Sequence, residues 1–369
     1  MNNWITSSNT IIFGPDFDEK LDNDLISNYQ IIIFSNFILD EKLFEMYHIY
    51  YSKTETDLYE ICGLNLPQTQ KNMFNQDISE LPSSIKNLDF GYSFNQDVSK
   101  LPSTITHLSF GYSFNQNLSK LPSSLVMLTL SSKCICNISK LPSSLIDLTF
   151  GFSFNGRTYG LPSSITHLTF GYSFNQMISK LPPFLTHLTF GGSFNQNISE
   201  LPSFITHLTF GSSFNQDVSE LPSFLTHLIF GSDFNQDISV LPSSITHLTL
   251  GTIFNLQCNI PSNIKYLTLN CNNQYIIDSL PNSIIELKLN YDFDLEVNNL
   301  PTSIKKLIIS KNSKYNMDLN CLPDFVEELY LNHFYKKRIL NIPSNLKKII
   351  CDKDYPYIND FAMCKVEAR

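Results

Sequence analysis

Hydrophobic and polar residues alternate along this chain in a pattern that returns every twenty residues. A Leu-Pro or Ile-Pro pair marks each return from Leu81 to Ile342, with one unit shortened and one lengthened by two residues. In one clean unit, residues 161–180, the main apolar residues stand at repeat positions 1, 5, 8, 10, 14 and 18. Self-similarity at a fixed period of this length predicts a repeat array.

Two of these apolar positions predict a short β-strand in each unit. Positions 8 and 10 are two apart, so Leu168 and Phe170 lie on one face of a strand, and His167 and Thr169 lie on the other. Six apolar residues in twenty cannot enclose a core alone, but stacked coils bury a continuous column of them. We therefore predict a mainly β repeat solenoid with coils of about twenty residues and one parallel β-sheet along one face.

Asparagine follows phenylalanine at repeat position 15. The turns of a solenoid leave backbone groups unpaired, and a side-chain amide, which both donates and accepts, can pair with them in the coils above and below. We therefore predict a structural ladder here, and no ligand site. Its members are Asn75, Asn95, Asn115, Asn155, Asn175, Asn195, Asn215, Asn235 and Asn255.

Histidine recurs at position 7, on the outward face of the predicted strands. Three interpretations stay open: a solvated column that continues the consensus, a strip that binds a partner protein, or a metal site. No carboxylate or cysteine completes a metal-ligand set beside the histidines. Near-identical coils offer a partner little information, so recognition is expected where position 7 becomes aromatic or charged. The candidate partner-binding face comprises His107, His167, His187, His207, His227, His247, Tyr266, Glu286 and Lys306.

The same column predicts a pH effect. Protonation of closely spaced imidazoles sets like charges against each other, so their pKa values should fall below the usual value of about 6.5.

A second irregular region, residues 156–160, breaks the Asn-Gln-x-Ile pattern of its coil and is another candidate for specificity.

Composition narrows the function. The formal net charge is -9, and the excess acidity lies within residues 1–80. No basic stripe suits nucleic acid. No apolar run is long enough to span a membrane, and residues 1–6 do not resemble a secretory signal. We expect a cytoplasmic protein whose eight irregularly spaced cysteines are reduced core thiols.

Catalytic patterns are missing from the sequence. It contains no glycine-rich phosphate loop, no nucleophile elbow and no His-Glu-x-x-His motif. Ser and Asp are plentiful but recur with the repeat, as scaffold residues do. We predict a protein that is not an enzyme, with no catalytic residues, no cofactor and no bound metal; a metal-dependent enzyme that uses the histidine column is the remote alternative.

The consensus Leu-Pro-x-Ser-Ile/Leu-Thr-His-Leu-x-Phe-Gly-x-x-Phe-Asn-Gln-x-Ile resembles the FNIP repeat, a relative of leucine-rich repeats. The resemblance is strong over residues 72–260 and weaker over 260–352. The family occurs in social amoebae and in large viruses that infect amoebae, which for a viral protein implies the host cytoplasm. It implies a protein-protein interaction scaffold that binds its partner on the sheet face.

The same resemblance suggests an alternative role, because family members often carry an F-box ahead of the repeats and are sometimes substrate receptors of ubiquitin ligases. Residues 1–65 show no F-box pattern, so this role needs a cryptic docking element. We predict degenerate N-terminal repeats or a cap over 1–65, with a small helical domain around residues 40–51 as the alternative. Near-consensus repeats over 66–259, divergent repeats over 260–352 and a C-terminal tail over 353–369 follow.

Overall fold

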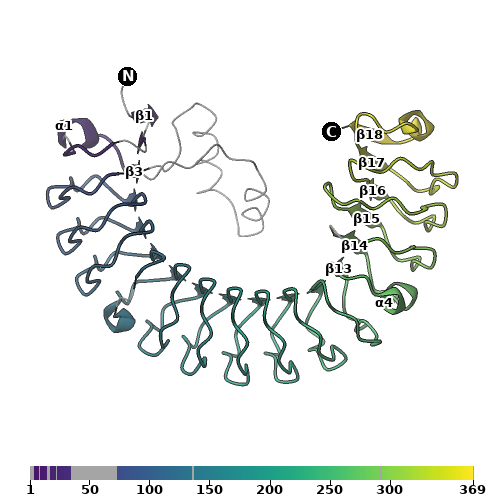
Figure 1. The fold of residues 1–369 in the computed structure, drawn as a ribbon, viewed down its shortest axis with the longest axis horizontal. Helices are drawn as coiled ribbons and strands as arrows, with labels where there is room; N and C mark the ends of the chain where they lie inside the picture. Colours follow the sequence, from purple (N-terminus) through teal and green to yellow (C-terminus); the bar gives the residue numbers. More distant parts are fainter. Residues whose placement is uncertain are drawn as a thin grey trace. The chain divides into compact units, whose positions relative to one another are not determined.

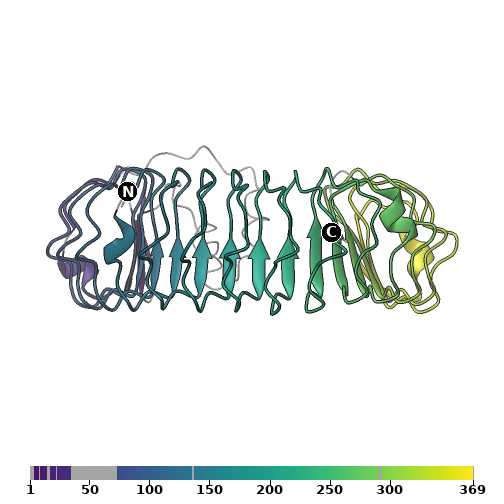
Figure 2. The ribbon, with the colours of Figure 1, turned by 90° about the horizontal axis from the view of Figure 1, so that it is seen from below.

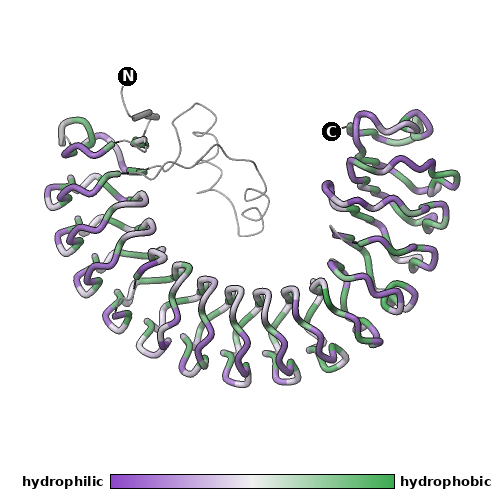
Figure 3. The backbone as a smooth tube through the Cα atoms, in the orientation of Figure 1, coloured by the Kyte–Doolittle hydropathy of each residue, from purple (hydrophilic) through white to green (hydrophobic). Residues whose placement is uncertain are grey.

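The computed structural model describes residues 4–7, 9–14, 17–21, 23–34, 73–134, 137–290 and 293–368. The chain forms two compact units, residues 1–171 and residues 172–369, which we call the N-terminal and C-terminal units. In both units, polar and apolar segments alternate along every coil (Figure 3), as the repeat pattern requires.

The N-terminal unit is a β-solenoid. Its elements are β1 (Trp4–Ser7), β2 (Thr10–Phe13), α1 (Asn23–Ile26), β3 (Ile31–Phe34), β4 (Asn87–Asp89), β5 (His107–Ser109), β6 (Met127–Thr129), the 3-10 helix η2 (Ile138–Lys140), β7 (Asp147–Thr149) and β8 (His167–Thr169). Strand β1 pairs with β2 in antiparallel orientation. From β2 to β8, each strand pairs in parallel with the next strand along the chain.

The C-terminal unit repeats the same architecture. Its elements are β9 (His187–Thr189), β10 (His207–Thr209), β11 (His227–Ile229), β12 (His247–Leu250), β13 (Tyr266–Leu269), α4 (Gln274–Asp278), β14 (Glu286–Leu289), β15 (Lys306–Ile309), β16 (Glu328–Tyr330), β17 (Lys348–Cys351), the 3-10 helix η3 (Ile358–Phe361) and β18 (Lys365–Ala368). Successive strands from β9 to β18 pair in parallel and lie side by side (Figure 1, Figure 2). Each unit therefore confirms the predicted solenoid of parallel strands.

Register between coils keeps each repeat position beside its own copy. Leu208 pairs with Leu188 and Leu228, and all three are at most 1% exposed. The phenylalanines at positions 10 and 14 form a double stack: the rings of Phe210 and Phe214 lie 3.7 Å apart, and Phe210 lies 5.8 Å from Phe230 in the next coil. Burial of each ring stabilises the fold by roughly 1.5–3 kcal/mol, so the column contributes to stability together with the buried leucines and isoleucines.

Glycine at position 11 allows the coils to approach closely. A Cβ atom on Gly171 would lie 2.0 Å from the carbonyl oxygen of Gly151 in the preceding coil. Backbone cannot move aside as a flexible side chain can, so any larger residue would force these coils apart.

The asparagines of position 15 link consecutive coils through their side-chain oxygens. The backbone N–H of Asn235 donates to Oδ1 of Asn215 at 2.9 Å, and the side chain of Gln236 donates to the same oxygen at 3.0 Å. Asn215 donates in turn to Oδ1 of Asn195 at 3.0 Å. These amides are half-buried or exposed, and their side-chain oxygens accept from the next coil; the side chain of Asn235 also donates to Oδ1 of Asn255 at 2.8 Å.

The first described coils use an aspartate in place of asparagine. Asp18 accepts from the backbone N–H of Asn75 at 3.0 Å and from the Gln76 side chain at 3.1 Å. The ring of Phe34 stacks on Phe74 at 4.0 Å, as Phe90 stacks on Phe94 at 3.6 Å. Three residues separate the second pair, whereas 39 separate the first.

Residues 35–72 lie outside the described residues. Much of the predicted degenerate N-terminal segment, the alternative helical domain around 40–51 and the boundary at residue 65 all fall there. The ubiquitin-ligase alternative, which depends on residues 1–65, stays a prediction.

The C-terminal segment differs from the predicted tail. Residues 353–369 include η3 and β18, and β18 pairs in parallel with β17 through Val366 and Ile349. This segment lacks the Leu-Pro signal that marks the other coils, which is why the sequence pattern did not reveal it. It adds a further strand to the sheet and covers the edge of β17.

We predict that Asn215→Ala destabilises the C-terminal unit by about 1–2 kcal/mol, because two hydrogen bonds from the next coil lose their acceptor. Asn215→Asp should cost less, since Asp18 already serves as the acceptor at the start of the series. Urea unfolding and hydrogen exchange at the Asn235 amide measure the effect. Equal exchange rates in the wild type and in Asn215→Ala would contradict it.

Candidate interaction face

The outward face of the sheet in the C-terminal unit carries a continuous stack of rings. His187, His207, His227, His247 and Tyr266 occupy the first positions of β9 to β13, in register. Consecutive ring centroids lie 4.2, 4.1, 3.8 and 4.2 Å apart, with planes within 17° of parallel. We call these five residues the ring ladder. Its histidines are half-buried, so they are less solvated than an outward strand position alone implies.

Threonines at position 6 orient the imidazoles. Thr206 Oγ1 lies 2.9 Å from Nδ1 of His207, and Thr226 Oγ1 lies 2.9 Å from Nδ1 of His227. Each hydroxyl also donates to a backbone carbonyl of the preceding coil, at 3.2 Å and 3.0 Å. A hydroxyl has one proton, so it must accept from Nδ1–H of the histidine, and Nε2 becomes the acceptor of the neutral ring.

Burial and mutual repulsion lower the pKa of two histidines of the ring ladder, His227 and His247. Burial, followed by the charges of His247, His207 and His187, lowers the pKa of His227 to about 4. The pKa of His247 is also lowered, by burial first and by His207 second, while Glu286 opposes the shift. The sequence prediction named repulsion alone; loss of hydration contributes more here because the rings cover one another.

Beyond Tyr266 the same column becomes a series of alternating charges, Glu286, Lys306, Glu328 and Lys348, which we call the charged ladder. Lys306 pairs with Glu286 at 3.0 Å, and its ammonium also lies 5.3 Å from the ring of Tyr330. The pKa of Lys306 is raised: burial works against this, and the hydrogen bond and charge of Glu286 outweigh it. The outward face thus changes from neutral acceptors to fixed charges at Tyr266.

The two other predicted histidines lie in the N-terminal unit, on strands that are not neighbours. His107 on β5 pairs in register with Met127 of β6, and His167 on β8 pairs with Asp147 of β7. Burial lowers the pKa of His107. Because Met127 and Asp147 interrupt the column, the face of this unit carries a mixture of side chains instead of a continuous stack.

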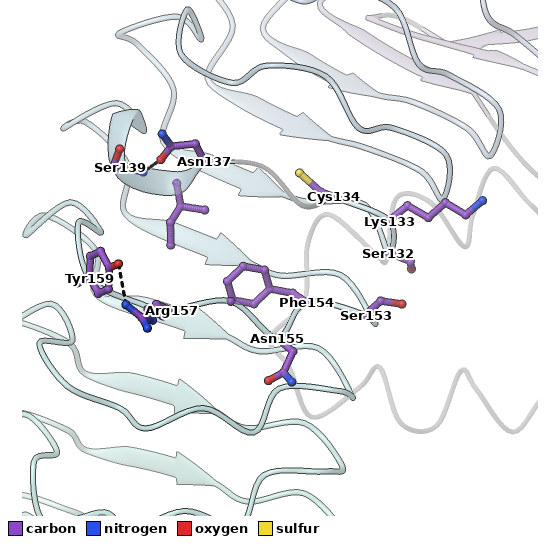
Figure 4. Close-up of a pocket in the computed structure, with 12 residues that line it drawn as sticks. Ser132, Lys133, Cys134, Asn137, Ser139, Ser153, Phe154, Asn155, Arg157 and Tyr159 are labelled. Carbon is purple, nitrogen blue, oxygen red and sulfur yellow. Dashed lines mark hydrogen bonds between the residues drawn. The ribbon is translucent and has the colours of Figure 1, made fainter.

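A cleft of about 840 Å³ opens in the N-terminal unit at the coil whose sequence is irregular (Figure 4). Position 14 is Cys134 instead of phenylalanine in one coil, which leaves space beside Phe154 of the next coil. Arg157 donates to the hydroxyl of Tyr159 at 3.3 Å on its wall. The described lining residues include two cationic side chains but no carboxylate or histidine, so the cleft suits polar or anionic groups and lacks a general acid-base pair.

The cysteines depart in part from the expected reduced core thiols. Cys271 and Cys351 are free and buried, as expected, but Cys321 is free and exposed. Cys134 is disulfide-bonded, and its partner lies outside the described residues. Irregular spacing in the sequence offered no pairing signal, because a disulfide depends on proximity in the folded coils.

Sequence reasoning missed a row of exposed aromatic side chains in the C-terminal unit. Phe184, Phe204 and Phe224 occupy position 4 of three consecutive coils, and we call them the phenylalanine stripe. They are 60%, 48% and 58% exposed. The signal was present in the sequence, since most other coils have serine, threonine or asparagine at position 4, whereas the predicted surface and ladder residues came from positions 7 and 15.

Among the described residues, no group of three or more His, Cys, Asp or Glu side chains is placed to hold a metal ion. In the same part of the chain, we find no helix whose length and apolar character would let it traverse a lipid bilayer.

Coils of about twenty residues with parallel strands and a phenylalanine-asparagine column define a leucine-rich-repeat-like solenoid. The model of the FNIP Repeat matches residues 74–101, 98–133, 159–193, 194–220, 217–252, 255–292, 272–312 and 291–334. These segments cover more than half of the chain, which therefore belongs to the FNIP repeat family.

Two solved structures are similar. CroV588, a circular leucine-rich-repeat protein from a giant virus, is 37% identical, with a TM-score of 0.61 over 76% of this chain and 49% of that chain. The functional domain of InlJ from Listeria monocytogenes is 15% identical, with a TM-score of 0.47 over 81% of this chain and 70% of that chain. The chain spans about half the length of CroV588. No curated protein matches it.

We predict that folding stability falls as the pH drops from about 6.5 to about 4. The pKa of His227 is lower in the folded chain than in the unfolded chain, so the unfolded chain takes up the proton first as the pH falls. The contribution of neutral His227 to the free energy of unfolding is therefore present above a pH of about 6.5 and is lost as the pH falls toward the pKa of the folded state. Thermal melts of His227→Thr should show a weaker pH dependence in this range than the wild type. A wild-type His227 that titrates near 6.5 in an NMR experiment would reject the prediction.

Proposed function

We propose that this chain is a non-enzymatic scaffold that binds a partner protein through the outward sheet face of its C-terminal unit. The main observation in support of this proposal is that the ring ladder continues directly into the charged ladder along the sheet face. The aligned rings offer a row of ring edges and acceptor nitrogens, while the alternating charges set the register of a partner.

Several features support a binding role over catalysis. The FNIP family and the leucine-rich-repeat-like coils belong to a type of scaffold that usually mediates protein interactions. The ring ladder repeats one kind of titratable group in one environment, whereas general acid-base chemistry needs groups whose pKa values are driven apart. Stacked neutral imidazoles are better suited to present surface than to exchange protons at neutral pH.

Specificity is expected around Tyr266, where the column changes character. Thr268, on the same strand, pairs in register with Thr249 on one side and Lys288 on the other. A partner that spans this point contacts acceptor nitrogens, an aromatic ring and the Glu286–Lys306 pair. Few other places on the C-terminal sheet combine these three chemistries.

We expect a photo-crosslinking amino acid at position 268 to yield adducts of discrete mass in the cells that express the protein. Exchange of the two charges in Glu286→Lys/Lys306→Glu keeps their mutual attraction and reverses the pattern that a partner meets. It also sets the new glutamate beside Glu328, so a thermal melt of the variant checks that the fold is kept. Adduct yield should fall about tenfold, which corresponds to a loss of ~1.4 kcal/mol in binding.

A matched control exchanges a charge pair elsewhere in the unit. Arg338 and Asp360 lie 2.7 Å apart, and Asp360 belongs to η3 and not to the sheet. The variant Arg338→Asp/Asp360→Arg should leave the adducts unchanged. Absence of adducts that depend on position 268, or equal yields in both exchange variants, would overturn the proposed function.

A further inference from the structure

The phenylalanine stripe occupies matching corners of three successive turns. The N–H of Ile205 donates to the carbonyl of Pro202 at 3.4 Å, which makes Phe204 the third residue of a tight turn; the turns that contain Phe184 and Phe224 close at 3.3 and 3.1 Å. Neighbouring rings of the stripe lie 6.1 Å apart in both steps. Turn corners project outward, so the three rings form one exposed row.

These phenylalanines replace a residue with a structural task. In several other coils the side chain at position 4 donates to a carbonyl of the preceding coil: Ser244 donates to Leu225 at 2.6 Å, and Ser164 donates to Leu145 at 2.6 Å. Ser84 and Ser283 do not make this bond, and the coil that begins at Leu322 has phenylalanine, Phe325, at the same position. Phenylalanine has no donor, so the three coils forgo this bond and expose apolar surface as well. Neither the lost hydrogen bond nor the exposed apolar surface stabilises the isolated fold, which points to a role in binding.

The coils that carry the stripe contain acidic side chains but no lysine or arginine. Residues 181–264 contain no lysine or arginine. Their carboxylates are Glu200, Asp217, Glu220, Asp233 and Asp237, all of them exposed. Glu200 stands at the corner of the turn that Leu201 closes onto Ile198, immediately before the turn that contains Phe204. Lys180 precedes the turn of Phe184 as Glu200 precedes the turn of Phe204, so the carboxylates outnumber the one cation beside the row and the net charge along it is negative.

We propose that the phenylalanine stripe is a second interaction surface, which receives a cationic amphipathic helix of a partner protein. Four residues of an α-helix rise about 6 Å, so apolar side chains at every fourth position match the 6.1 Å spacing of the rings. Lysine or arginine beside them meets Glu200 and Glu220. Negative charge along the row disfavours an anionic lipid surface.

Fluorescence anisotropy with the full chain tests the proposal. The probe is a labelled synthetic helical peptide with leucine at three successive fourth positions and flanking lysines. We expect Phe184→Ser/Phe204→Ser/Phe224→Ser to raise Kd at least about tenfold, and Glu200→Gln/Glu220→Gln to raise it and to flatten its salt dependence. Equal binding by the triple serine variant, or by a peptide with glutamate in place of lysine, would overturn the proposal.

The serine variant is suited to this test because other coils already carry serine at this position. Its melting temperature should equal or exceed that of the wild type, since the hydroxyl can donate to the preceding coil as Ser244 does. The variant Glu286→Lys/Lys306→Glu should bind the peptide normally, which separates this surface from the sheet face. Stripe-dependent binding to zwitterionic vesicles without binding to the peptide would also overturn the proposal.

Discussion

Parallel register between neighbouring coils is the constraint from which the rest of this structure follows. Because Leu208 faces Leu188 and Leu228, each repeat position meets the same position of the neighbouring coils, and a side chain that packs well against its own kind can be repeated along the array. Leucine, phenylalanine and asparagine satisfy this condition in the core and at its edge. The same condition explains why imidazoles stack along the sheet.

The same register also determines which positions can confer specificity for a partner. A position that is repeated identically stabilises the array but distinguishes nothing, so a binding surface requires departures from the repeat. Two such departures in the C-terminal unit are the change from rings to charges at Tyr266 and the phenylalanines that replace serine in three consecutive coils. Both leave the core columns untouched, so they alter the surface at little cost to the fold.

Much of the fold could be predicted from the sequence because spacing alone determines which residues share a face. Leu168 and Phe170 point inward, as their separation of two implies, and glycine stands where Gly151 leaves no room for a Cβ atom. The strand β18 could not be predicted in this way, because it joins the sheet without the repeat motif. Pairing by an edge strand demands a free edge more than a particular sequence.

The candidate face was less predictable for a different reason. The position of the histidines followed from the repeat, but their state depends on neighbours: Thr226 fixes the tautomer of His227, and the adjacent rings exclude water from it. The cleft beside Phe154 arises from a missing ring in another coil, and the disulfide of Cys134 depends on proximity in space. Such properties belong to pairs of coils, which a pattern read along one coil does not contain.

The stacked pair Phe34 and Phe74 shows how tolerant this architecture is of added sequence. A single coil closes there although 39 residues stand between two rings that are elsewhere four positions apart. The entropic cost of bringing two residues into contact rises only with the logarithm of the number of residues between them, so the contact between the rings is kept at this separation. A solenoid of this kind can therefore acquire whole new segments between core positions 10 and 14, and evolution or an engineer can graft a foreign module there while the coils on either side remain stacked.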